Sequence, residues 1–320
     1  MASRDNRRYT GPEKSIPIIA LKPPNNIQFL DSNGQRRDKR SPTDVRKIYM
    51  GLSNISQAKG SSYVEVGDTK VICGVYGPRE MAPSNTFKLT GQVCCEVKLA
   101  PFAYHVRRSP VPDRQVKELS TQLKETFQAA IVLEQYPKAQ IDVHVTVIED
   151  GGGLLSACIN AATLALCDAN IHMYDVVVAA TLVWHAGRIY LDPSLQEEEC
   201  LARAGERFVP AQVPRRVDAD VVSKGAGLTN GAAAPAMISS YAPVVSYGVL
   251  TVGLMPLYAS SQVALMVMSG SVTAEQIQEG LESGLEACRK VYGVVKQVLL
   301  HNNKQDENDA HEKQAISNGR

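Results

Sequence analysis

Alternating apolar and polar residues predict a strand-rich amino-terminal half. Residues 61–66 and 69–76 are rich in β-branched and aromatic side chains, and the Gly67-Asp68 pair between them is typical of a two-residue hairpin turn. Gly77-Pro78 is expected to end the second strand, because proline cannot donate to the hydrogen-bond ladder. The same alternation predicts further strands at residues 92–99 and 141–148.

Three segments have the periodicity of helices. Residues 116–135 carry apolar side chains on one face, which is typical of a helix lying on a sheet, and Tyr136-Pro137 should end it. Residues 154–167 are apolar on nearly every face, so this helix should be buried. Thr273 and Gln276 have the spacing of a capping box, and an apolar stripe continues from there to Leu299.

The carboxyl-terminal half also contains strand signals. Residues 176–184 form an almost entirely apolar run of strand length, which predicts a strand in the centre of its sheet. A short strand is expected at residues 189–192, and residues 249–255 and 262–268 should pair with each other. Residues 202–246 are rich in Ala, Gly, Pro and Ser and follow neither period, so we predict an inserted flexible loop.

These patterns divide the chain into three parts. We predict a flexible N-terminal arm (1–40), one domain that contains the inserted loop (41–303) and a disordered C-terminal tail (304–320), because the arm and the tail are polar and lack periodicity. The arm ends in a charge run at residues 36–40. We interpret this run as a solvated segment, and contact with RNA or with a neighbouring subunit is the alternative.

Charge and composition narrow the classes of function. The 34 basic and 33 acidic residues leave a net charge of +1, so any contact with RNA must come from a local patch. Seven cysteines, an odd number without a CxxC motif, predict reduced thiols in an intracellular protein rather than a disulfide framework or a zinc site. No apolar run reaches the length of a membrane span, and we expect no membrane partner.

Three consecutive glycines, at residues 151–153, join the predicted strand 141–148 to the buried helix. Glycines at a strand-to-helix turn can present backbone N–H groups and the positive end of a helix dipole to a phosphate. The spacing matches no dinucleotide or P-loop pattern, no Lys or Arg follows, and Glu149 and Asp150 would repel an anion. We therefore interpret the glycines mainly as a means of tight turning and close packing.

A proline-punctuated loop at residues 100–114 is the candidate RNA contact. It carries Arg107, Arg108 and Arg114 beside aromatic side chains, the combination that single-stranded RNA binding uses. A solvated surface loop with no ligand has the same composition. Taken alone, the residues leave both interpretations open.

Several short motifs in one order resemble the RNase PH family. They lie at residues 56–65, 67–70, 75–78, 100–102, 136–141, 160–166 and 173–175. Within the family the chain is most similar to the mRNA-transport-regulator branch of the eukaryotic RNA exosome ring, on the segments 7–13, 56–60, 100–103 and 173–178. The resemblance implies an α/β (α+β) fold, with two β-sheets and packed helices in a βαβ arrangement.

The resemblance also implies partners. Six such domains close a ring, which predicts RNase PH-like subunits on both flanks in a hetero-hexamer, an S1-type cap subunit above, and single-stranded RNA. Arg107 and Arg108 match the basic positions of subunits that feed RNA into the channel, where they would hold phosphates without reading sequence. The implied location is the nucleus, including the nucleolus, and the cytoplasm.

The active members' catalytic groups are not all matched. Their Gly-Thr-Arg turn grips the attacking phosphate, and the matching positions here are Leu154 and Leu155, which cannot form paired bonds to phosphate. Of the two metal-holding aspartates, one falls near Glu198 and the other near Gly248. We expect no bound metal and no cofactor, and we interpret the acidic run 197–199 as solvated surface, with a weak metal site as the alternative.

Three hypotheses follow. The first is a non-catalytic ring subunit that contacts threaded RNA through Arg107, Arg108 and Arg114. The second is an active phosphate-dependent 3′-to-5′ exoribonuclease, and the discriminating feature is the Gly-Gly-Gly-Leu-Leu turn against Gly-Thr-Arg. The third is an assembly scaffold without RNA contact.

Overall fold

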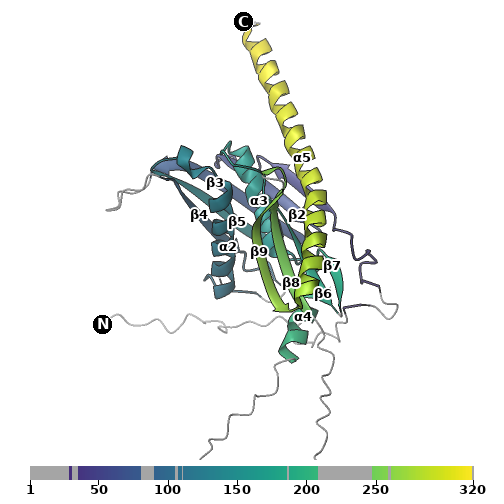
Figure 1. The fold of residues 1–320 in the computed structure, drawn as a ribbon. Helices are drawn as coiled ribbons and strands as arrows, with labels where there is room; N and C mark the ends of the chain where they lie inside the picture. Colours follow the sequence, from purple (N-terminus) through teal and green to yellow (C-terminus); the bar gives the residue numbers. More distant parts are fainter. Residues whose placement is uncertain are drawn as a thin grey trace, which may run out of the picture.

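Two β-sheets enclose a buried helix (Figure 1). The computed structural model describes residues 29–30, 35–80, 90–104, 107–109, 111–185, 187–207, 247–258 and 261–318. Residues 1–28 of the expected arm and residues 208–246 of the expected loop lie outside this described part. No helix in the described ranges combines the length and apolar character that crossing a bilayer requires.

The first sheet has the order β1-β2-β3-β5-β4. Its strands are β1 (Ile48–Leu52), β2 (Gly60–Val66), β3 (Thr69–Glu80), β4 (Gln92–Leu99) and β5 (Ala139–Glu149). The predicted hairpin is confirmed, because β2 pairs antiparallel with β3 up to Val66 opposite Thr69. The expected stop at Gly77-Pro78 is wrong: the ladder between β3 and β5 shifts register between Tyr76 and Arg79 and then resumes.

The second sheet is antiparallel throughout and has the order β7-β6-β8-β9. Its strands are β6 (Val178–His185), β7 (Arg188–Leu191), β8 (Tyr247–Met255) and β9 (Gln262–Ser271). The apolar run predicted to be central is β6, which lies between β7 and β8. β8 and β9 pair as the sequence predicts.

In the described part of the chain, four α-helices accompany the sheets: α2 (Arg114–Ala130), α3 (Leu154–Asp168), α4 (Leu195–Arg207) and α5 (Ala274–Asn318). α2 ends five residues earlier than predicted, because Ile131 becomes extended and bridges to Met173, and a short 3₁₀ turn (Leu133–Gln135) follows. α5 begins as expected, since the Thr273 N–H donates to Gln276 Oε1 at 3.2 Å.

α3 is the centre of the main core. All of its residues from Leu154 to Leu166 are buried, as the absence of a polar face predicts, and it packs against both β2 and β6. α5 covers the opposite face of the second sheet, where Leu182, Trp184 and Ala287 form a smaller core. All seven cysteines are free thiols.

The described end of the expected N-terminal arm is packed rather than solvated. Phe29 is buried, and its ring stacks on His185 with 4.3 Å between centroids. Arg36 is 1% exposed and forms a two-pronged ion pair with Glu197, through Nε at 2.8 Å and Nη2 at 2.6 Å. The charge run 36–40 is therefore not simply solvated, because its first arginine has a buried carboxylate partner.

The expected loop and tail boundaries also change. α4 continues through Arg207, six residues into the segment expected to be a flexible loop. α5 continues through Asn318, across most of the expected disordered tail, and extends beyond the sheets in Figure 1. The tail sequence contains no proline and only one glycine, near its end, so nothing in it interrupts the hydrogen-bond ladder of the helix.

Candidate functional site

The glycine turn between β5 and α3 is shaped by close backbone packing. Gly152 has φ of +99° and Gly153 has φ of +63°, a region that favours glycine. A Cβ atom on Gly152 would lie 2.6 Å from both Pro193 O and Leu195 N, in the connection between β7 and α4. This geometry confirms the packing interpretation of the three glycines.

A protein carboxylate lies at the N-terminus of α3. The Gly153 N–H donates to Glu198 Oε1 at 2.8 Å, so the N-cap position of the helix faces an acid from α4. Burial raises the pKa of Glu198 from 4.5 to about 7, the Gly153 hydrogen bond opposes the shift, and nearby Asp150 adds to it. An anion at a helix N-terminus is stabilised by the unpaired N–H groups and the dipole. Here that anion belongs to the chain.

The expectation of a solvated acidic run at residues 197–199 is wrong. Glu197 is buried against Arg36, and the burial of Glu198 raises its pKa. The run forms the first turn of α4, which packs onto the glycine turn instead of continuing a surface loop. Within the described residues, no group of three or more His, Cys, Asp or Glu is arranged to hold a metal ion.

An arginine that the sequence analysis did not single out completes the turn. Arg46 donates through Nη1 to Gly151 O at 2.8 Å and through Nη2 to Gly152 O at 2.9 Å. Its Nε and Nη2 also bind the two carboxylate oxygens of Asp192 at 2.9 and 2.7 Å. These contacts use Nε, Nη1 and Nη2 of the guanidinium group. Arg46 therefore links the backbone of the turn to Asp192 and is not directed at an open space.

Leu154, Leu155 and Gly248, predicted as degenerate positions, lie in packed surroundings. Leu154 and Leu155 are 8% and 9% exposed and belong to the main core. Gly248 is on β8, and a Cβ there would lie 2.6 Å from Val272 Cγ2 and 3.4 Å from Trp184 Cε3. A carboxylate therefore has no room at position 248 unless Val272 moves.

The loop before α2 is attached to the glycine turn. The Asp150 N–H donates to Ala103 O at 3.2 Å, and Asp150 Oδ1 accepts the Gly152 N–H at 3.0 Å. Burial, the negative charge of Asp150 and a hydrogen bond to that carboxylate raise the pKa of Tyr104. Tyr104 in turn supports Arg108, whose guanidinium carbon lies 3.8 Å from the ring centroid. The loop is thereby positioned by the same turn that binds Glu198.

The three predicted RNA-contacting arginines lie along one stretch and differ in their contacts. Arg107 is exposed. Arg108 is partly buried and also donates to Gln115 Oε1 at 3.0 Å. Arg114 opens α2, its side chain is 92% exposed, and it pairs with Glu118 at 2.9 Å. The three arginines therefore differ in exposure, and Arg108 and Arg114 have different hydrogen-bond partners.

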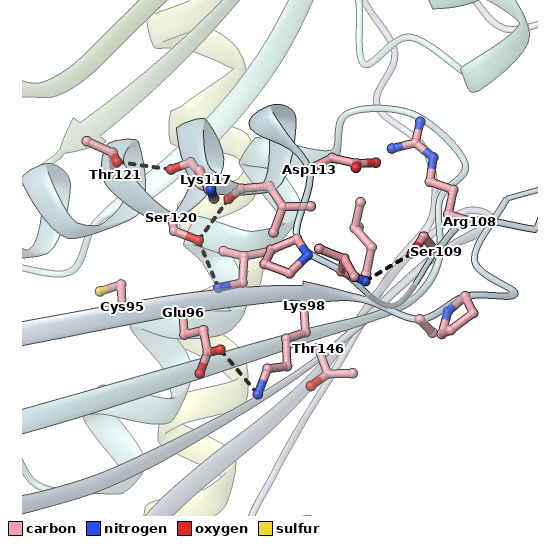
Figure 2. A pocket seen from close by; sticks show the side chains of 17 residues that line it. Cys95, Glu96, Lys98, Arg108, Ser109, Asp113, Lys117, Ser120, Thr121 and Thr146 are labelled. Atoms are coloured by element: carbon pink, nitrogen blue, oxygen red, sulfur yellow. Dashed lines mark hydrogen bonds and ion pairs between the residues drawn. The ribbon is translucent and has the colours of Figure 1, made fainter. Parts of the chain in front are cut away.

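Two cavities flank this loop. The first, about 640 Å³, lies between β4 and the start of α2, and Figure 2 shows Lys98, Lys117 and Arg108 around it. The second, about 830 Å³, lies beside the glycine turn and includes Phe102, which is 69% exposed. Four carboxylates and three cations line the second cavity, so its lining carries no excess of positive charge for a phosphate: Asp38, Asp68, Glu149 and Asp150 against Arg40, Arg46 and Lys47.

Comparison with known families and relatives gives consistent results. The family described as "3' exoribonuclease family, domain 1" (RNase_PH) matches residues 44–172. Exosome complex component MTR3 of Homo sapiens is 33% identical over 315 residues, which cover 92% of this chain and 94% of that protein. Exosome complex component Rrp41 of Cenarchaeum symbiosum is 28% identical over 85% of this chain and 93% of that protein.

Solved structures share the fold. Rrp46 of rice (Oryza sativa) matches with a TM-score of 0.61 at 20% identity, over 82% of this chain and all of that one. A chain of the Archaeoglobus fulgidus exosome with RNA bound to the active site matches with a TM-score of 0.58, also at 20% identity, over 82% of this chain and 92% of that one. At this level of identity the likeness concerns the fold, and it confirms the two-sheet α/β architecture predicted from the sequence.

Proposed function

This chain belongs to the RNase PH (3′ exoribonuclease) family, and we propose that it is a non-catalytic ring subunit of the RNA exosome. The similarity to a protein named as an exosome component extends over 94% of that relative, so it includes both sheets and their helices. In this proposal the chain sits in a hetero-hexameric ring between two RNase PH-like subunits and beneath an S1-type cap. It acts in the nucleus, the nucleolus and the cytoplasm.

The hydrogen bond from Gly153 to Glu198 carries the non-catalytic part of the proposal. Phosphorolysis needs an inorganic phosphate to approach the reacting centre, but the Glu198 carboxyl group already accepts the N–H at this helix N-terminus, and in its ionised form it would repel that phosphate. Leu154 and Leu155 supply no cation to offset that repulsion. Arg46 is engaged by Asp192 and two carbonyl oxygens.

The RNA-contacting part rests on the loop that contains Arg107 and Arg108. Arg107 is exposed, and Arg108 presents a guanidinium stacked on Tyr104, where both can meet phosphate oxygens of a passing strand. Arg114 adds an exposed cation at the start of α2. Such contacts hold the backbone of RNA without sequence preference.

Charge reversal in the assembled ring tests this function. We expect Arg107→Glu/Arg108→Glu to enter the ring normally and to reduce ultraviolet crosslinking of single-stranded RNA to this chain at least five-fold, because the two changes replace attraction by repulsion. Arg188→Glu, which changes an exposed arginine on β7, is the matched control and should leave crosslinking unchanged.

Two results would contradict the proposal. Unchanged crosslinking in the double variant would leave a scaffold without this RNA contact. Failure of the wild-type chain to enter a ring with RNase PH-like partners would remove the ring assignment itself.

A further inference from the structure

Exposed apolar side chains are concentrated at the β8–β9 hairpin. Ten large apolar residues are exposed in the described chain, and half of them lie between residues 257 and 268. They are Leu257 at the turn, Tyr258 beside it, and Val263, Met266 and Met268 on β9, with exposed fractions from 39% to 71%. Clustered apolar exposure of this kind marks a surface that another molecule covers.

Leu257 and Tyr258 are held in place by hydrogen bonds from their backbone. The N–H groups of Leu257 and Tyr258 both donate to Asp175 Oδ2, at 2.6 and 3.0 Å. Asp175 is itself 8% exposed, and the ring of Tyr258 contacts that of Tyr174 with 5.5 Å between centroids. A buried carboxylate therefore holds the apolar turn in place.

The four outer strands of the two sheets are not equally protected. The β4 edge is met by α2, because Ser120 Oγ accepts the Val97 N–H at 3.1 Å. The β7 edge is met by the N-terminal segment, because the Leu191 N–H donates to Pro42 O at 2.8 Å. β1 is only five residues long. Short length and coverage by another element are two ways in which proteins prevent edge pairing.

β9 is longer than β1, and α2 packs against it without a hydrogen bond to its outer edge among the described residues. It is ten residues long, reads Gln-Val-Ala-Leu-Met-Val-Met-Ser-Gly-Ser, and contains neither a charge nor a proline. Leu265 and Val267 pack towards the main core and anchor the strand on one face. No backbone group of another described element hydrogen-bonds to its outer edge. With respect to the described residues, the N–H and C=O groups on this edge are therefore available to an extended chain.

We propose that β9 pairs with a β-strand of one neighbouring RNase PH-like subunit, which continues the second sheet across the interface. This inference rests on the proposed ring function. The partner segment should be an extended strand rather than a helix, because only a strand can hydrogen-bond to the alternating N–H and C=O groups along an unpaired strand edge. The uncharged edge and its methionines call for an apolar, uncharged face on that strand.

Lysine substitution on the exposed edge tests the proposal in the complete ring. Met266→Lys/Met268→Lys places two charges on the exposed face of β9, beside the apolar side chains that a paired strand would present, while lysine stems at such exposed positions reach solvent and leave the fold intact. We expect the double variant to have the thermal midpoint of the wild type and at least ten-fold weaker binding to one flanking subunit. Tyr49→Lys is the control, because Tyr49 is 62% exposed on the edge strand of the other sheet.

Hydrogen exchange distinguishes strand pairing from side-chain contact alone. Amides on the outer edge of β9 should exchange rapidly in the isolated chain and slowly in the ring. If the wild-type chain assembles into the ring and the Met266→Lys/Met268→Lys variant binds the flanking subunit equally well, this inference is overturned. The proposed function would still stand. Slow exchange in the isolated chain that is lost on deletion of residues 1–28, or protection by a second copy of the chain, would also overturn this inference.

Discussion

Glu198 defines the chemistry of the glycine turn at the scale of single residues. Its carboxylate takes the backbone N–H that a phosphate would need at the start of α3, and the neighbouring carboxylates of Asp150 and Asp192 raise its pKa further. A partly buried acid whose pKa is about 7 is partly protonated at neutral pH. The N–H at the start of α3 is therefore occupied by a side chain whose charge changes within the physiological pH range.

The raised pKa of Glu198 predicts a specific pH dependence of stability. Between pH 4.5 and pH 7 the folded chain binds this proton more strongly than the unfolded chain, so the contribution of Glu198 to stability falls as pH rises through that window. Glu198→Gln keeps an acceptor for Gly153 and removes the titration. We compare the unfolding free energy of the variant with that of the wild type at pH 4.5 and at pH 8. From the lower to the higher pH, the variant should gain stability relative to the wild type by at most ~3 kcal/mol.

Urea unfolding at the two pH values measures this shift. Glu282→Gln, at an exposed position of α5, is the control, and its difference from the wild type should not change with pH. An equal pH response of the Glu198→Gln and wild-type chains would show that burial does not perturb this carboxyl group.

Local patterns could not identify the partners of these residues. Arg46 and Asp192 are 146 residues apart, and Arg36 and Glu197 are 161 residues apart. Periodicity describes only neighbours along an element, so a charge run such as 36–40 or 197–199 looks solvated until the fold supplies its partner. Glu198 was singled out only through the family resemblance, and its bond to Gly153 was not foreseen.

The glycine turn works as an element because it allows β5, α3 and the β7–α4 connection to meet. Gly152→Ala would place a methyl group 2.6 Å from two backbone atoms and would keep a positive φ. We expect this substitution to destabilise the chain by more than ~2 kcal/mol, because neither backbone can withdraw without moving an element.

Gly187→Ala separates the cost of the positive φ from the cost of the steric overlap. Gly187 also has a positive φ, +77°, but nothing lies within 4 Å of an added Cβ. Denaturant midpoints should therefore show a cost of about 1 kcal/mol from backbone strain alone at Gly187. A cost at Gly152 no larger than at Gly187 would contradict the close-packing role of this turn.

The sequence predicts which helices and strands form better than it predicts the residues at which they begin and end. The strands from β2 to β9 and the buried α3 follow from alternation and from continuous apolar runs. The end of α2 depends on the bridge between Ile131 and Met173, and β3 passes Gly77-Pro78 because β5 accepts a shifted register. Both are tertiary pairings, and these override local preference.

At the scale of the whole molecule, the two sheets and α3 form the scaffold that holds the glycine turn, while the surfaces differ in character. One edge of the first sheet leads to the arginine loop and the cavity in Figure 2. The β9 edge of the second sheet is apolar and uncharged. Such a division suits a subunit that contacts nucleic acid through one surface and protein through another.

In the proposed function this chain does not itself break RNA, and an assay of phosphorolysis tests this directly. The purified chain, alone and in a reconstituted ring, is incubated with 3′-extended labelled RNA, inorganic phosphate and Mg²⁺, and nucleoside diphosphates are quantified. We predict no release by the chain alone, and the same release from rings that contain the wild-type or the Glu198→Gln chain. Phosphate-dependent release by the wild-type chain that falls at least ten-fold with Glu198→Gln would contradict the non-catalytic function.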